Sequence, residues 1–404
     1  MPLARPILAI AAALSLALAP AHAAETRSFE EIAEAARGQT VFWNAWGGDP
    51  GTNAFIEWVD GEMRERYGVS VTHVKLTDTA EAVTRVLAER AAGRAEGGSV
   101  DLIWINGPNF LAMKNEGLLH GPFVEALPNF ALVDTIDKPS NVVDFTVPVE
   151  GLAAPWRIAQ IAFLHDGERL PREDAPRSIE ALGDWARANP GLTTHPTARN
   201  FLGATFLKQA LYALAPDAEI LSAPPTDALY EETTAPLWDW YEALRPSLWR
   251  EGREFPESGA ALDQLLADGE IDMAITFNPA EAAAGILDGR LPETTRVFFL
   301  DGGTIGNTSF VAIPFNAANK EGAMVVANFL MSPLAQARAQ DPARLGAFTV
   351  LALDRLTEDE RAAFDMTDAH PAMPAPGEIV PVLPEPHPDW MTRLVADWEA
   401  RVAR

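Results

Sequence analysis

The stretch VPVEGLAAPWRIAQIAFLHD, Val147–Asp166, decides the fold of this 404-residue chain. Its second half, Ile158–Leu164, is apolar at nearly every position, which is typical of a strand buried on both faces. Its first half carries Pro148, Gly151 and Pro155, which do not suit the interior of a regular strand. We therefore predict a crossover here, where the chain leaves one α/β unit and enters a second, with a cleft beside it.

Upstream of this stretch, the apolar pattern predicts alternating strands and helices. Strands are expected at 40–43, 69–74 and 101–105, with helices at 54–67 and in the segment that follows Asp78. This order predicts a parallel sheet with right-handed crossovers, in which ligands bind beyond the carboxyl ends of the strands. Two loops with unusual composition follow strands at that edge, Asn44–Asn53 and Asn106–Phe110.

Downstream, the pattern predicts that the chain returns to the first unit. A strand at 272–277 runs into Asn278-Pro279-Ala280 and is interpreted as the return crossover. We therefore expect a first lobe of residues 24–148 and 276–318, and a second lobe of residues 149–275 and 319–404. The hinge is expected near Val149–Pro155 and Phe277.

The first 23 residues have the pattern of a secretory signal. Arg5 gives a basic start, Ile7–Ala19 an apolar run, and Ala21-His22-Ala23 a small-residue cleavage site, which predicts cleavage after Ala23 and export to the periplasm. The apolar run is shorter than the about 20 residues that span a bilayer. The chain has no cysteine, so neither a disulfide nor a thiolate site can form.

Charge and motifs exclude several classes of function. The net charge of −26 repels nucleic acid, and no hydrolase elbow, zinc-protease, P-loop or dinucleotide motif occurs. The histidines have no ligand-like spacing, so we expect no metal site, no cofactor and no catalytic residue. The overall acidity favours a cationic ligand only as a bias.

Aromatic and amide side chains give the positive signal. Trp46 and Trp156 stand beside glycine or proline and are interpreted as ligand-stacking rings, whereas Trp43 and Trp104 lie within strands and are interpreted as core. Asparagines in the loops after strands offer both a donor and an acceptor, or act only as turn residues. Arg157 could bind a carboxylate or phosphate. The candidate ligand-binding residues are Trp46, Gly47, Asn106, Asn109, Trp156, Arg157, Asn278 and Asn307.

Several motifs together resemble a known family. FWNAWGGDPGTN, DLIWINGPNF, APWRIAQIAFLHD, DMAITFNPAEA and IGNTSFVAIP followed by NFLMSPLAQA are similar to the YnjB-type solute-binding proteins of ABC importers, in the type II periplasmic binding class. The resemblance implies an α/β fold of two lobes, each a mainly parallel sheet flanked by helices, joined by crossing strands. It also implies a small solute held between the lobes, and a membrane permease with its ATPase as partners.

We therefore expect a monomeric, exported, non-enzymatic binding protein that captures a small polar organic solute and delivers it to an ABC importer. Two alternatives remain open on the sequence. One is a periplasmic receptor that senses a ligand without transport, and the other is an exported hydrolase of small molecules.

Overall fold

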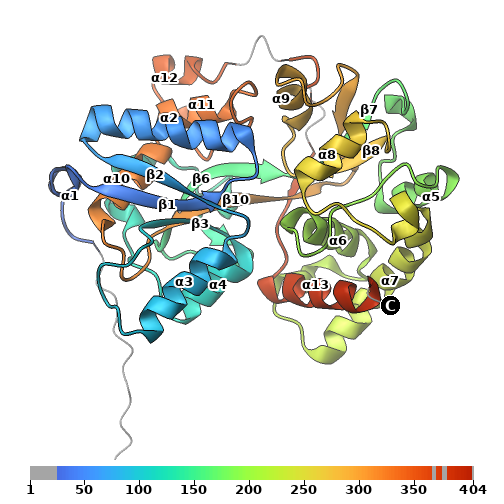
Figure 1. Cartoon of the computed structure of the whole chain (residues 1–404), viewed down its shortest axis with the longest axis horizontal. Coiled ribbons are helices and arrows are strands. Elements are labelled where there is room, and N and C mark those ends of the chain that lie inside the picture. The colour runs from blue at the N-terminus through green and yellow to red at the C-terminus, as the bar shows by residue number, and fades with distance from the viewer. Residues whose placement is uncertain (1–24, 366–369, 375–379, 403–404) are drawn as a thin grey trace, which may run out of the picture.

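The computed structural model describes residues 25–365, 370–374 and 380–402. The proposed signal and its cleavage site lie outside these residues. The chain packs as two units that lie side by side and are joined by long strands, β6 and β10, in Figure 1. Within the part that the structure describes, no helix combines the length and the apolar character needed to cross a membrane.

The first unit is a sheet covered by helices on both faces. Its strand order is β11-β10-β3-β1-β2, with β6 paired to β10, and β1 runs parallel to both β2 and β3. One face packs against α1, α2, α10 and α11, and the other against α3 and α4. The strands are β1 (Thr40–Trp46), β2 (Ser70–Leu76), β3 (Leu102–Ile105), β6 (Ala153–Gln160), β10 (Thr304–Ala312) and β11 (Val382–Leu383). The helices are α1 (Phe29–Ala36), α2 (Pro50–Tyr67), α3 (Ala80–Ala91), α4 (Gly107–Asn115), α10 (Lys320–Leu330), α11 (Pro333–Gln340) and α12 (Glu358–Ala362).

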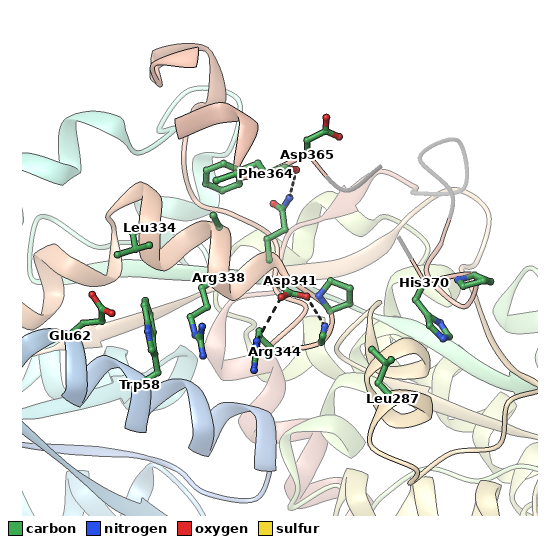
Figure 2. A pocket seen from close by; sticks show the side chains of 16 residues that line it. Trp58, Glu62, Leu287, Leu334, Arg338, Asp341, Arg344, Phe364, Asp365 and His370 are labelled. Atoms are coloured by element: carbon green, nitrogen blue, oxygen red, sulfur yellow. Dashed lines mark hydrogen bonds and ion pairs between the residues drawn. The ribbon is translucent and has the colours of Figure 1, made fainter. Parts of the chain in front are cut away.

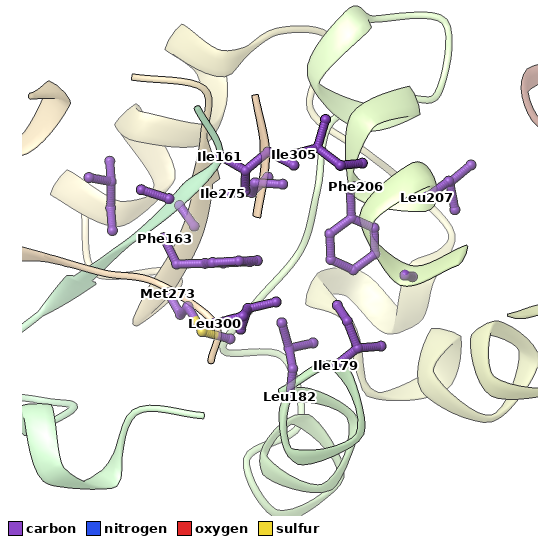
Figure 3. Packing of buried hydrophobic residues seen from close by; sticks show 14 of the residues in the cluster. Ile161, Phe163, Ile179, Leu182, Phe206, Leu207, Met273, Ile275, Leu300 and Ile305 are labelled. Carbon is purple, nitrogen blue, oxygen red and sulfur yellow. The ribbon is translucent and has the colours of Figure 1, made fainter. Parts of the chain in front are cut away.

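The second unit has its own core, shown in Figure 3, where Ile161 and Phe163 of the crossing strand meet Leu182 and Phe206. Its strands β8 and β9 both pair antiparallel with β7. The strands are β7 (Ala162–Asp166), β8 (Met273–Thr276) and β9 (Thr295–Phe298). The helices are α5 (Ile179–Ala188), α6 (Phe201–Leu214), α7 (Asp227–Leu244), α8 (Gly259–Ala267), α9 (Glu281–Leu287) and α13 (Pro388–Val402). A short hairpin, β4 (Val143–Asp144) with β5 (Val147–Pro148), precedes the crossing.

The first crossover lies within the predicted stretch Val147–Asp166, but after the predicted lobe boundary at residue 148. Strand β6 begins at Ala153 and continues through Pro155, and the core changes from the first unit to the second between Ile158 and Ile161. Proline is accommodated because β6 is a sheet edge and Pro155 lies next to a bulge in its pairing with β10. The change of core thus lies C-terminal to Val149–Pro155, where the sequence predicts the hinge.

The return crossover also differs from the prediction. Strand β8 leads into α9 and β9, which remain in the second core, and the chain returns only along β10, whose Ile305 lies in the second core and Val311 in the first. The strand at 272–277 was expected to cross because it is apolar and ends in Asn-Pro, but a buried strand inside either unit has the same pattern.

Two segments therefore pack in the opposite unit from the one that the sequence predicts. Residues 276–303 contribute to the second core, and residues 320–364 contribute to the first. The chain changes core a third time between Phe364, which lies in the first core, and Ala372, which lies in the second, so that α13 completes the second core with Trp390, Leu394 and Trp398. The two-lobe α/β class is confirmed, while the sequence boundaries at 276 and 319 do not match the packing.

Candidate functional site

Two tryptophans stand at the edge of the first sheet that faces the second unit. Trp46 ends β1 and Trp104 lies in β3, and their rings meet edge to face with centroids 6.5 Å apart. Both side chains are partly exposed. The Trp46 ring folds back over Gly48, where an added Cβ would lie 2.5 Å from the indole. Glycine at this position therefore allows the ring to lie across the strand end.

A bulge in β6 places Arg157 beside these rings. Ser309 of β10 pairs with Arg157 while Phe310 pairs with Pro155, so Trp156 is the extra residue. Bulges re-aim side chains at functional sites. Here the Arg157 guanidinium lies 4.5 Å from the Trp104 ring centroid and 5.1 Å from that of Trp156. The cation is thus held against two aromatic rings.

The Arg157 side chain has no hydrogen bond or ion pair with any residue that the structure describes, and its buried Nε has no partner. Burial lowers the pKa of its guanidinium to about 10, and the charge of Asp49 opposes that shift. The side chain nevertheless keeps part of its surface in solvent. Arg157 is therefore a charged, accessible group whose charge the protein leaves largely uncompensated.

Trp156 does not lie where the sequence analysis expected it. Its side chain is fully buried, stacked on Phe55 at 5.9 Å and edge-on to Trp43 at 5.8 Å between ring centroids. A ring without exposed surface cannot stack directly on a solute in this conformation. The sequence suggested otherwise because Pro155 precedes Trp156 and indicated a loop, whereas the residue lies in β6.

The second unit meets the first through the loop after β8. Asn278 donates from Nδ2 to the Leu345 carbonyl at 3.4 Å, and its Oδ1 accepts from the Ala280 amide at 3.0 Å. Gly346 allows this approach, since a Cβ there would lie 2.3 Å from the Ala280 Cβ. Asn278 thus joins residues of the two packing units.

Both backbone groups of Gly47 have a partner within the protein. Its amide donates to the Leu76 carbonyl at 3.0 Å, and its carbonyl accepts from Asn53 Nδ2 at 3.1 Å. The amide is thereby engaged, while the carbonyl oxygen can accept a second hydrogen bond.

Acidic groups of the second unit lie near Asp49. Glu281 pairs with Arg290 at 2.9 Å, and Asp263 lies 3.9 Å from the same guanidinium. Burial raises the pKa of both carboxyls, for Asp263 well above its ordinary value, and the Asp49 charge adds to both shifts. Since Asp49 also influences Arg157, the cation and this acidic group belong to one electrostatic neighbourhood.

A sealed polar network adjoins the crossing strands. Lys208 Nζ donates to Glu385 Oε2 at 2.5 Å, and Asn307 Nδ2 donates to Glu385 Oε1 at 2.8 Å. The ammonium also lies 4.6 Å from the ring centroid of Phe145 and 4.7 Å from that of Phe201. These residues come from both units, so the network holds the units together rather than facing solvent.

Asn106 is likewise engaged with protein. Its Nδ2 donates to Asp144 Oδ1 at 3.3 Å and to the Thr308 carbonyl, while the Gly107 amide donates to Asp144 Oδ2 at 2.6 Å. Burial raises the Asp144 pKa to about 7 against the opposing effect of these hydrogen bonds. Asn109 lies partly exposed in the first turn of α4.

A separate pocket of about 810 Å³ opens between α2, α11 and α9. Figure 2 shows Trp58 and Arg338 on one side and Leu287 and His370 on the other. The Arg338 guanidinium lies 4.5 Å from the Trp58 ring centroid. This volume suits a small ligand, but the pocket includes none of the eight predicted residues. Across the described residues, no group of three or more histidine, aspartate or glutamate side chains could hold a metal ion.

The structure therefore divides the eight predicted residues. Trp46, Asn109 and Arg157 are partly exposed, and Trp156 is fully buried. The groups of the other four, Gly47, Asn106, Asn278 and Asn307, are bonded to protein. Sequence reasoning missed Trp104, Lys208 and Glu385. A single lysine inside the apolar run FLKQAL was an available signal for Lys208.

The chain belongs to the family of bacterial extracellular solute-binding proteins, whose model matches residues 58–364. Within this class it is 43% identical to protein YnjB of Escherichia coli (strain K12) over 385 residues, 95% of this chain and 96% of that protein. The resemblance seen in the sequence motifs is thereby confirmed.

Solved structures share the fold at low identity. The periplasmic binding protein AfuA of Actinobacillus pleuropneumoniae, with exogenous fructose-6-phosphate bound, has a TM-score of 0.62 at 15% identity, covering 91% of this chain and 99% of its own. Iron-bound HitA of Pseudomonas aeruginosa has a TM-score of 0.61 at 16% identity, covering 90% and 99%. A putative spermidine/putrescine transporter of Listeria monocytogenes gives 0.61 at 17%, covering 90% and 98%. These likenesses show the type II periplasmic binding fold.

Proposed function

We propose that this chain captures a small polar organic solute between its two packed units and delivers it to the permease of an ABC importer. The observation that carries the proposal is Arg157, a charged and accessible side chain without a protein counter-ion, set against tryptophan rings where the two units meet. A charge left in that condition costs free energy unless a ligand compensates it.

We propose different roles for the predicted residues. Trp46, Trp104 and Arg157 contact the solute, the two rings by stacking and the guanidinium by hydrogen bonds. Asn106, Asn278 and Asn307 hold elements of the two units together, and Trp156 supports the guanidinium from the core. The protein acts outside the cytoplasm as a monomer after cleavage at Ala23.

The relatives support transport and leave the solute open. Proteins with this fold are described with a sugar phosphate, with iron and as a polyamine transporter. The ligand must therefore be argued from this chain's own residues.

The test is a thermal-shift screen of the chain from Ala24 onward against amines, thiamine, sugars, amino acids and phosphate esters, followed by titration calorimetry of each hit. A solute at 100 times its dissociation constant adds about 2.7 kcal/mol, a shift of several degrees. Each hit is then incubated with protein and recovered. If the compound is recovered chemically unchanged, binding for transport is supported. If the compound is converted, the proposed function is contradicted and the hydrolase alternative is favoured.

Delivery is tested separately with an ABC permease and its ATPase reconstituted in vesicles. We expect the loaded protein to stimulate ATP hydrolysis and solute uptake. Binding without stimulation or uptake would favour the receptor alternative.

A further inference from the structure

Arg157 differs from two other buried or partly buried cations, Arg290 and Lys208, in having no counter-ion. Arg290 is paired with Glu281 at 2.9 Å, and Lys208 with Glu385 at 2.5 Å. Arg157 has no carboxylate within ion-pair distance among the described residues. The protein thus compensates the neighbouring cations and leaves this one without a counter-ion.

The guanidinium is held against aromatic rings without using its hydrogen-bond donors. Its central carbon lies 4.5 Å from the Trp104 ring centroid and 5.1 Å from that of Trp156, and its Nε has no partner among the described residues. The N–H donors of a guanidinium lie in the fork geometry that matches a carboxylate or a phosphate. The ring contacts therefore leave donors for a ligand.

Trp46 completes the arrangement. It meets Trp104 edge to face at 6.5 Å, and its partly exposed ring lies at the carboxyl end of β1. A solute whose anionic group reaches Arg157 would bring its adjoining body against these rings. Stacking rings of this kind bind flat groups such as heterocycles or the apolar faces of sugars.

We propose that the solute is an organic anion, a carboxylate or phosphate ester with a flat body, whose anionic group is bound by Arg157. This inference rests on the proposed function and adds the chemical class of the solute to it. The net charge of −26 is spread over the chain, and salt screens the distant carboxylates. Of the nearer ones, Glu281 and Asp263 face Arg290, and none lies within ion-pair distance of Arg157 among the described residues.

The direct experiment uses pairs of probes that differ in one anionic group: nicotinate with nicotinamide, glucose 6-phosphate with glucose, and thiamine monophosphate with thiamine. Thermal shifts are measured on the wild type, on Arg157→Met and on Arg338→Met. The last is the matched control, because Arg338 also lies 4.5 Å over a tryptophan with its buried Nε unpartnered, but in the pocket of Figure 2.

We expect at least one anionic probe to bind 10-fold or more tightly than its neutral partner, with Arg157→Met removing the preference and Arg338→Met keeping it. A neutral or cationic probe that binds equally to the wild type and Arg157→Met overturns the substrate class and leaves the proposed function standing. If Arg157→Met and Arg338→Met lose the preference for the anionic probe to the same extent, the proposed solute class is also overturned. Conversion of a probe would instead overturn the proposed function.

A second measurement needs no ligand. If Arg157 serves to bind an anion, its charge destabilises the ligand-free protein, and Arg157→Met removes that charge. The ligand-free variant should therefore unfold at the same temperature as the wild type or at a higher one. This result supports the proposal even if all six probes fail to bind. A midpoint lowered by several degrees would show that the cation serves the fold, and would overturn the proposal.

Discussion

Lys208 and Arg157 are two cations beside the same crossing strands, and the protein treats them in opposite ways. Lys208 is fully buried, paired with Glu385 and set against two phenylalanine rings. Arg157 is partly exposed and stacked on tryptophan without a counter-ion. The charge of Lys208 therefore helps to join the two units, whereas the charge of Arg157 remains available to a ligand. Burial and partner, rather than residue type, decide which role a cation has.

The largest expected effect on stability comes from replacing Lys208. Lys208→Met leaves Glu385 buried without its cationic partner, and we expect the free energy of unfolding to fall by about 3–5 kcal/mol. Urea denaturation followed by fluorescence measures it. The double variant Lys208→Met, Glu385→Gln removes both charges and should recover much of the loss. If the single variant is as stable as the wild type, Lys208 has no joining role.

An intermediate effect concerns Asp144, whose pKa burial raises from 3.8 to about 7. Between these values the folded protein binds more protons than the unfolded chain, so this group contributes stability that is greatest at low pH and is lost as pH rises to 7. From pH 4 to 6.5 the change is about 3 kcal/mol. Asp144→Asn cannot titrate, so its stability should decline less with pH than that of the wild type.

The measurement is the urea midpoint of both proteins at half-unit steps from pH 4 to pH 8. The difference between the two curves isolates Asp144 from the other buried acids, Asp263, Glu281 and Glu385. Parallel curves would show that Asp144 keeps an ordinary pKa.

The smallest expected effect on stability comes from replacing Trp46, which we propose contacts the solute together with Arg157. Trp46→Leu removes one edge-to-face pair from a partly exposed position, and we expect a loss of about 1 kcal/mol in unfolding free energy. Its effect on solute affinity should be larger, at 10-fold or more, measured by calorimetry with the hit from the screen. Trp240→Leu is a control on α7, in the second unit, and should leave affinity unchanged. Equal affinity of Trp46→Leu and the wild type would remove Trp46 from the site.

The sequence predicted the fold well and the site only in part. Alternation of apolar strands and helices in the first unit was readable because the sheet is covered on both faces. The crossings were misplaced because a strand spanning two cores, such as β10, is as apolar as one inside a single core. Local pattern does not record which unit a buried strand belongs to.

Within the site, exposure was the quantity that sequence could not supply. Trp156, the extra residue at a bulge in β6, is buried, whereas Trp104 in β3 keeps exposed surface, and neither outcome follows from the local sequence. The asparagines were recognised as polar groups at strand ends, but their partners, such as Glu385 for Asn307, are distant in sequence. Such pairings follow from the third crossing, which no local motif indicates.

The pairing of the two crossing strands has a mechanical consequence. Strand β10 is bonded to β6 from Gly306 to Ala312 and to β11 at Thr304 and Ile305, and Gly306 allows the close approach of β11, since a Cβ there would lie 2.7 Å from Val382. Two bonded strands, β6 and β10, therefore connect the units. Bending within the plane of this pair would stretch the hydrogen bonds between the strands, so we expect relative motion of the units to bend the pair across its flat face.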